Sequence, residues 1–140
     1  MDTPTSKTES NSEAMLDVLF IDDSPNLCRA MELWLKTSGY SAEIALNAAT
    51  AEEIASRKPP RVVIADIGLP DASGYDLRRR LKEIPGLADT HFIALSGQRD
   101  RGVPRHSIEA GFDTFISKPP DFEELACILE KRIPDHSGAA

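Results

Sequence analysis

The sequence lacks several features, and each absence excludes a class of protein. No apolar run approaches the roughly 18 residues that a membrane-spanning helix needs. The polar N-terminus contains no apolar segment of a secretory signal, so we expect a cytoplasmic protein that is not bound to a membrane. The two cysteines, Cys28 and Cys127, match no CxxC motif, and we expect both to be reduced thiols packed in the core.

Positive charge is also scarce. The 140 residues carry 16 Lys and Arg against 23 Asp and Glu, a formal net charge of −7. Direct nucleic-acid binding is disfavoured, because it depends on neutralising phosphates with cationic side chains. The 41% hydrophobic and 28% charged content is typical of a globular protein, and the length suits one domain. Residues 1–15 and 134–140 are too polar to order themselves, so we expect disordered ends around a domain at 16–133.

Short apolar runs rich in Val, Ile and Phe predict five strands, at 16–21, 41–46, 61–66, 91–95 and 113–117. Helical spacing predicts helices between and after them, from 25 to the stop at Gly39, and at about 48–57, 74–83, 104–110 and 121–132. In the first helix the apolar stripe consists of Leu27, Ala30, Met31 and Trp34. Strict alternation favours a doubly wound α/β fold with a parallel sheet between two helical layers.

The fourth helix has the weakest pattern. Gly97, Gly102 and Pro104 interrupt it, and a proline inside a helix removes a hydrogen bond and clashes with the preceding turn. We therefore expect this helix to begin near Pro104, after a loop at 97–103.

Polar side chains stand where the predicted strands end. They are Asp22 and Asp23 after the first strand, Asp66 after the third, Ser96 after the fourth and Lys118 after the fifth. In an open parallel sheet, ligands bind beyond the carboxyl ends of the strands, so we expect these groups to converge.

The chemistry of this set favours phosphoryl transfer. Three crowded carboxylates repel one another, and a hard divalent cation such as Mg²⁺ relieves the repulsion. With the ammonium of Lys118 and one Mg²⁺, the formal charges sum to zero. Asp66 is suited to accept a phosphoryl group, whose oxygens the metal, Lys118 and the Ser96 hydroxyl can stabilise.

The motifs "IDDSP", "ADIGLPDASGYDL", "ALSG" and "AGFDTFISKP" resemble, in composition and spacing, the receiver domain of two-component response regulators, the CheY-like family. The resemblance covers about residues 16–132. It implies a flavodoxin-like (βα)5 fold with strand order 2-1-3-4-5. It also implies phosphorylation by a histidine kinase or a histidine phosphotransfer protein.

The resemblance assigns a role to each site residue. Asp66 is the implied phosphoacceptor, and the implied magnesium ligands are Asp22, Asp23, Asp66 and the backbone carbonyl of Gly68. Ser96 and Phe115 are the implied switch residues, Lys118 is the family's lysine, and Pro119 follows a cis peptide bond. Phe115 stands where many members have tyrosine, and its alternative is plain core packing. We expect Gly68 and Gln98 to set the lifetime of the phosphorylated form.

The sequence therefore predicts a stand-alone receiver that signals through protein contacts with an unknown target. We expect no enzymatic turnover beyond self-catalysed phosphotransfer and autodephosphorylation. One alternative is a receiver segment of a hybrid histidine kinase. Another is a phosphohydrolase of the haloacid dehalogenase type, although such enzymes carry a DxD motif after the first strand, whereas this chain has adjacent Asp22 and Asp23 there.

Overall fold

The computed structural model describes residues 15–96 and 112–134. Five parallel strands form one sheet: β1 (Leu16–Ile21), β2 (Ala42–Ala45), β3 (Pro60–Asp66), β4 (His91–Ser96) and β5 (Thr114–Ser117). The order is β2-β1-β3-β4-β5, with every neighbouring pair parallel. The predicted doubly wound, flavodoxin-like α/β fold is confirmed.

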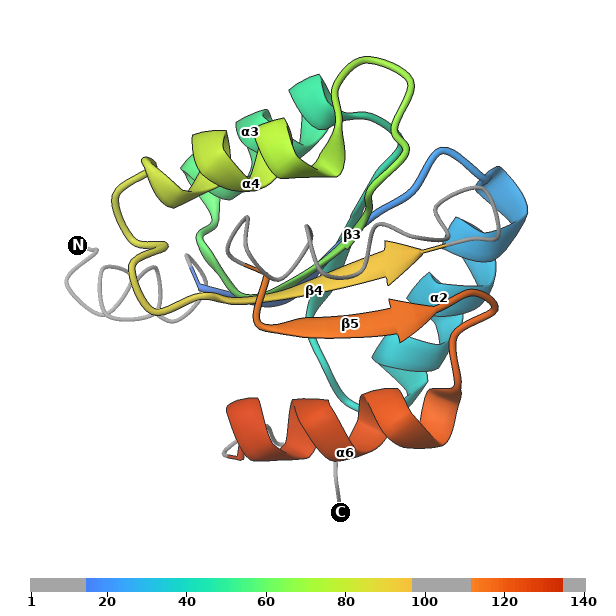
Figure 1. Ribbon diagram of the computed structural model, residues 1–140. Coiled ribbons are helices and arrows are strands. Elements are labelled where there is room, and N and C mark those ends of the chain that lie inside the picture. The colour runs from blue at the N-terminus through green and yellow to red at the C-terminus, as the bar shows by residue number, and fades with distance from the viewer. Residues whose placement is uncertain (1–14, 97–111, 135–140) are drawn as a thin grey trace, which may run out of the picture.

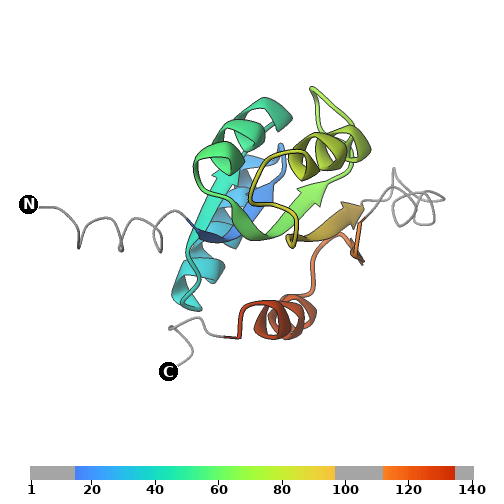
Figure 2. The same cartoon turned by 90° about the vertical axis from the view of Figure 1, so that its left-hand side faces the viewer.

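Four described helices cover the two faces of the sheet. They are α2 (Pro25–Thr37), α3 (Ala48–Arg57), α4 (Gly74–Lys82) and α6 (Phe122–Arg132). Figure 1 shows α3 and α4 on one face and α2 and α6 on the other, and the turned view in Figure 2 again separates α3 and α4 from α6. Among the described helices, none is both long enough and apolar enough to cross a bilayer. The predicted helix at 104–110, the loop at 97–103 and nearly all of the two predicted disordered ends lie outside the described residues.

The predicted helix boundaries have a local cause. The Ser24 hydroxyl caps α2 by accepting the Leu27 N–H at 3.3 Å, and Pro25 occupies the first turn, where no N–H is needed. Gly39 follows α2 with a φ of 96°, the left-handed conformation that glycine adopts without strain. The Ser73 hydroxyl caps α4 in the same way by accepting the Asp76 N–H at 3.1 Å.

The core consists of two apolar layers, one on each face of the sheet. Alternate residues of β3 serve the two layers: Val63 packs on the α3 and α4 side, and Val62 packs on the α2 and α6 side. Successive residues along a strand thus point alternately into the two core layers. Since both faces are covered, the central strands contain unbroken apolar runs, at 18–21 in β1, 62–65 in β3 and 92–95 in β4.

Two details of the predicted core were wrong. The buried stripe of α2 consists of Cys28, Met31 and Leu35, while Ala30 of the predicted stripe is exposed. The apolar residues of α2 cover a wide arc, and packing against the sheet decided which side of it faces inward. Cys127 is exposed rather than buried, because it lies two residues from both Leu125 and Leu129, the buried face of α6.

Candidate functional site

The register of the sheet aligns the ends of four strands. Ile21 pairs with Ala65 across β1 and β3, and Ser96 pairs with Ser117 across β4 and β5. The residues that end or follow these strands therefore share one edge. This is the edge toward which the arrows of β4 and β5 point in Figure 1. It holds Asp22, Asp23, Asp66, Ser96 and Lys118.

The three predicted acids form a cluster. Asp22, Asp23 and Asp66 each offer one carboxylate oxygen, and these atoms all lie within 4.8 Å of one another. Asp22 and Asp66 are fully buried at 0% and 1% exposure, whereas Asp23 is exposed. Burial strengthens the repulsion between carboxylates, because fewer water molecules screen them. The cluster thus requires compensation by cations.

Lys118 supplies part of that compensation. Its Nζ lies 2.7 Å from Asp22 Oδ2 and 3.4 Å from Asp66 Oδ2. Burial works against the charged ammonium, but the two carboxylates outweigh it and raise the pKa of Lys118 above its ordinary value. Lys118 is therefore charged at neutral pH, and it bridges the acids of β1 and β3.

The environment of Asp66 still lacks positive charge. Burial raises the pKa of its carboxyl group, and nearby Asp22 adds to the rise. The Gly68 N–H, which donates to Asp66 Oδ1 at 3.1 Å, and the Lys118 ammonium oppose it without reversing it. Three formal negative charges face one positive charge here, so a further cation would stabilise the ionised carboxylate.

The donor set suits a hard divalent cation. Asp22 Oδ2 and Asp66 Oδ2 are buried, and apart from their ion pairs with Lys118 neither accepts a hydrogen bond from any described residue. Carboxylate oxygens with unused lone pairs are the ligands that Mg²⁺ prefers. The residues present therefore fit the predicted metal, although the coordinating role of the Gly68 carbonyl stays a prediction.

Ser96 lies at this edge, Phe115 lies two residues before the end of β5, and the switch role of each stays a prediction. Ser96 is buried at the end of β4, and its carbonyl accepts the Lys118 N–H at 2.8 Å, which ties the lysine to β4. Phe115 is partly buried and packs against the core layer of α3 and α4. Core packing thus accounts for Phe115 in this structure, and its switch role stays a prediction. Gln98 lies outside the described residues, and the peptide bond between Lys118 and Pro119 is cis, as the resemblance implied.

Two contacts that orient Asp22 were missed by sequence reasoning. The Ser24 N–H donates to Asp22 Oδ1 at 2.9 Å, and the Cys28 thiol donates to the Asp22 carbonyl oxygen at 3.1 Å. Burial raises the pKa of Cys28 to about 11, so the thiol keeps its proton and remains a donor. The available signal was the position of Cys28 four residues after the cap Ser24, which places it in the first turn of α2, next to the acids.

Fold and site together define a flavodoxin-like α/β protein with a lysine-bridged cluster of acids at the carboxyl ends of its strands. Residues 18–130 match the family model described as the response regulator receiver domain. The chain therefore belongs to the response regulator receiver domain family, a signalling family of two-component systems, and the predicted resemblance is confirmed.

Curated and structural relatives agree with this assignment. The transcriptional regulatory protein KdpE of Mycobacterium tuberculosis is 35% identical over 123 residues, covering 88% of this chain and 53% of KdpE. An uncharacterised 14.6 kDa protein of Leptolyngbya boryana is 26% identical over 84% of this chain and 90% of its own. The signal receiver domain of a histidine kinase from Syntrophus aciditrophicus is 30% identical, with a TM-score of 0.75 over 85% of this chain and 90% of that one. The chain spans about half the length of KdpE and of the response regulator Rre1 of Synechocystis.

Proposed function

We propose that this receiver accepts a phosphoryl group on Asp66 from a phosphohistidine of a histidine kinase or phosphotransfer protein. The phosphorylated form then signals through contacts with another protein. One observation carries the proposal: Lys118 Nζ lies within 3.4 Å of buried carboxylate oxygens of both Asp22 and Asp66, beside exposed Asp23. This arrangement combines a nucleophile, a fixed cation and further acids that can hold a second one.

In the proposed transfer, a carboxylate oxygen of Asp66 forms a bond to phosphorus while the phosphorus–nitrogen bond of the donor breaks. The departing imidazole keeps that electron pair. Lys118 balances charge on the transferring oxygens, and the Ser96 hydroxyl donates to one of them. The Gly68 N–H holds the Asp66 carboxylate in place at 3.1 Å. Positioning and electrostatics thus supply the catalysis, and no turnover of a separate substrate is expected.

Mg²⁺ held by Asp22, Asp23, Asp66 and the Gly68 carbonyl would supply Lewis-acid stabilisation of the phosphoryl oxygens. The unused lone pairs of Asp22 Oδ2 and Asp66 Oδ2 support this metal site. The Ser24 N–H and the Cys28 thiol keep Asp22 oriented whether or not the cation is bound.

Intact-protein mass spectrometry tests the phosphoacceptor. The full chain is incubated with acetyl phosphate with and without Mg²⁺, alongside Asp66→Asn and the control Asp76→Asn, which changes a carboxylate on α4 outside the cluster. We expect one added phosphoryl group in wild type and in the control, dependent on Mg²⁺, and none in Asp66→Asn. Equal labelling of Asp66→Asn would refute the assignment.

A second candidate is the receiver segment of a histidine kinase, favoured by the 30% identity to such a domain from Syntrophus aciditrophicus. The stand-alone role, in the cytoplasm, is the one that we propose. The mass of the protein in its native cells decides between them. A species of 15.3 kDa, the mass of this chain, would support the stand-alone receiver, and only larger species would contradict it.

A further inference from the structure

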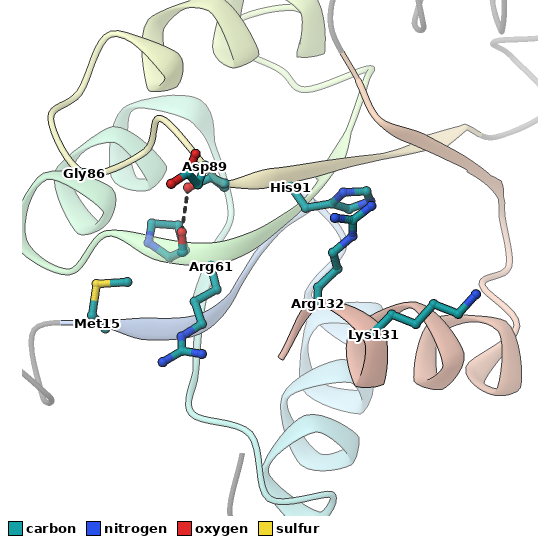
Figure 3. Close-up of a pocket in the computed structure, with 9 residues that line it drawn as sticks. Met15, Arg61, Gly86, Asp89, His91, Lys131 and Arg132 are labelled. Atoms are coloured by element: carbon teal, nitrogen blue, oxygen red, sulfur yellow. Dashed lines mark hydrogen bonds between the residues drawn. The ribbon is translucent and has the colours of Figure 1, made fainter. Parts of the chain in front are cut away.

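A second polar site lies at the opposite edge of the sheet, where the strands begin. Two adjacent hollows of about 340 and 210 Å³ meet there and share four residues: Asp89, Thr90, His91 and Arg132. Figure 3 shows Arg132 extending from α6 toward the ring of His91, with Arg61 on β3 across the hollow. Six-residue β4 separates this edge from the acid cluster, a length of roughly 20 Å.

Cations dominate the lining of both hollows. We define the basic trough as the two hollows together, with its charged lining residues Arg61, Arg78, Lys82, Lys131, Arg132, Asp89 and Asp113. Five cations against two carboxylates give the trough a formal charge of +3, on a chain whose net charge is −7. Positive charge is thus concentrated in one concave region of an acidic protein, which attracts anions there.

Two of these cations have no carboxylate partner in the part of the chain that the structure describes. Among the described residues, no carboxylate oxygen lies within 4.0 Å of the side-chain nitrogens of Lys131 or Arg132, whereas Arg80 on the helical surface pairs with Glu52 at 2.8 Å. Arg61, across the hollow, lies 4.0 Å from a carboxylate oxygen of Asp17.

A buried donor in the second hollow also has no acceptor among the described residues. Arg78 Nε is buried and has no hydrogen-bond partner in the described part of the chain. The guanidinium lies 5.7 Å from the centre of the Phe92 ring, which restrains its position. A buried N–H without a partner costs stability, and an anion bound in the hollow would supply the acceptor.

We propose that the basic trough binds a small anion carrying two or more phosphate groups, such as a polyphosphate or the phosphate chain of a nucleotide. Guanidinium groups match phosphate oxygens in geometry and charge, and Arg61, Arg78 and Arg132 contribute three of them. The larger hollow lies within the size range of small-molecule sites. Two hollows that share a wall suit a ligand with several charged groups better than a single phosphate.

Calorimetry of the full chain with sodium tripolyphosphate, in EDTA and at constant ionic strength, tests this. We expect saturable one-to-one binding, weakened at least tenfold in Arg61→Gln/Arg132→Gln. The matched control Arg29→Gln/Arg79→Gln removes two exposed arginines outside the trough and should bind like wild type. Asp66→Asn should also bind like wild type, so a failure of the phosphoacceptor proposal and a failure of this one are distinguishable.

NMR and competition experiments locate the site and identify the kind of ligand. Tripolyphosphate should shift the amide NMR signals of Thr90 and His91 and leave those of Asp22 and Asp66 in place. ATP binding tenfold more tightly than tripolyphosphate would support a nucleotide ligand, and equal binding would support free polyphosphate. The proposal would be overturned if tripolyphosphate did not bind, or if both pairs of arginine substitutions weakened its binding equally. Tight binding of a single-stranded oligonucleotide that tripolyphosphate does not displace would also overturn it.

Discussion

Gly74 controls how closely α4 approaches the strand that ends in Asp66. A Cβ at this position would lie 2.6 Å from the Ile67 Cα, about 0.8 Å closer than an ordinary van der Waals contact allows. Ile67 follows Asp66 directly, and its carbonyl accepts the Gly74 N–H at 3.0 Å. The backbone of Ile67 cannot rotate away as a flexible side chain would, so Gly74→Ala must displace the helix, the strand end, or both.

The cost follows from the size of this displacement. Overpacking a rigid contact destabilises by about 1–3 kcal/mol, so we expect a loss of about 2 kcal/mol and a fall in Tm of roughly 8 °C. A misplacement near 1 Å at a reacting group can cost on the order of a hundredfold in rate. Phosphorylation of Asp66 by acetyl phosphate should therefore slow by about ten- to a hundredfold.

Gly86→Ala is the matched control. Gly86 has a φ of +99° and would meet the Pro59 side chain at 2.9 Å, so its replacement should destabilise by a similar amount. It lies at the other edge of the sheet and should leave the phosphorylation rate of the folded protein within twofold of wild type. Equal rates for Gly74→Ala and Gly86→Ala, measured below both Tm values, would refute the argument.

Four further changes test the electrostatics and burial. Lys118→Met should lower the free energy of unfolding by about 2 kcal/mol at pH 7 without Mg²⁺, because the buried acids lose their cation. Saturating Mg²⁺ should restore most of this loss, and urea denaturation that shows no change in the variant would contradict the prediction. Burial raises the pKa of Asp66, so the ionised carboxylate lowers the stability of the fold at pH values above that pKa. Asp66→Asn should therefore raise Tm at pH 8 without Mg²⁺, and this gain should shrink as the pH falls toward about 4. A gain in Tm that does not depend on pH would contradict this. Asp71 accepts the N–H groups at the start of α3 at 2.8 and 3.1 Å, so Asp71→Ala should cost about 1 kcal/mol in chemical denaturation while Asp71→Asn costs less. A thiol reagent should modify exposed Cys127 in the native protein within minutes and leave Cys28 unmodified, and fast labelling of both would show that Cys28 is not buried.

Local patterns were sufficient for most of the fold. Helical spacing from residue 25 to the stop at Gly39 placed α2 within two residues of its observed ends, and the runs "LDVLFI" and "RVVIAD" placed β1 and β3 within one. These signals act over a few neighbouring residues, so the sequence contains them directly. Both errors in the predicted core, at Ala30 and Cys127, concerned how far a helix is rotated about its axis.

The sequence by itself determined the order in which strands and helices follow one another along the chain. It also determined which strands are followed by acids, by a hydroxyl or by a lysine. Only the tertiary structure decided that Lys118 bridges Asp22 and Asp66, which are 96 and 52 residues away in the chain. It also decided that Cys28 supports Asp22 and that Arg61 and Arg132 line one trough. The physical reason is that strand register and helix rotation depend on how both core layers pack together, and packing is a property of the whole domain.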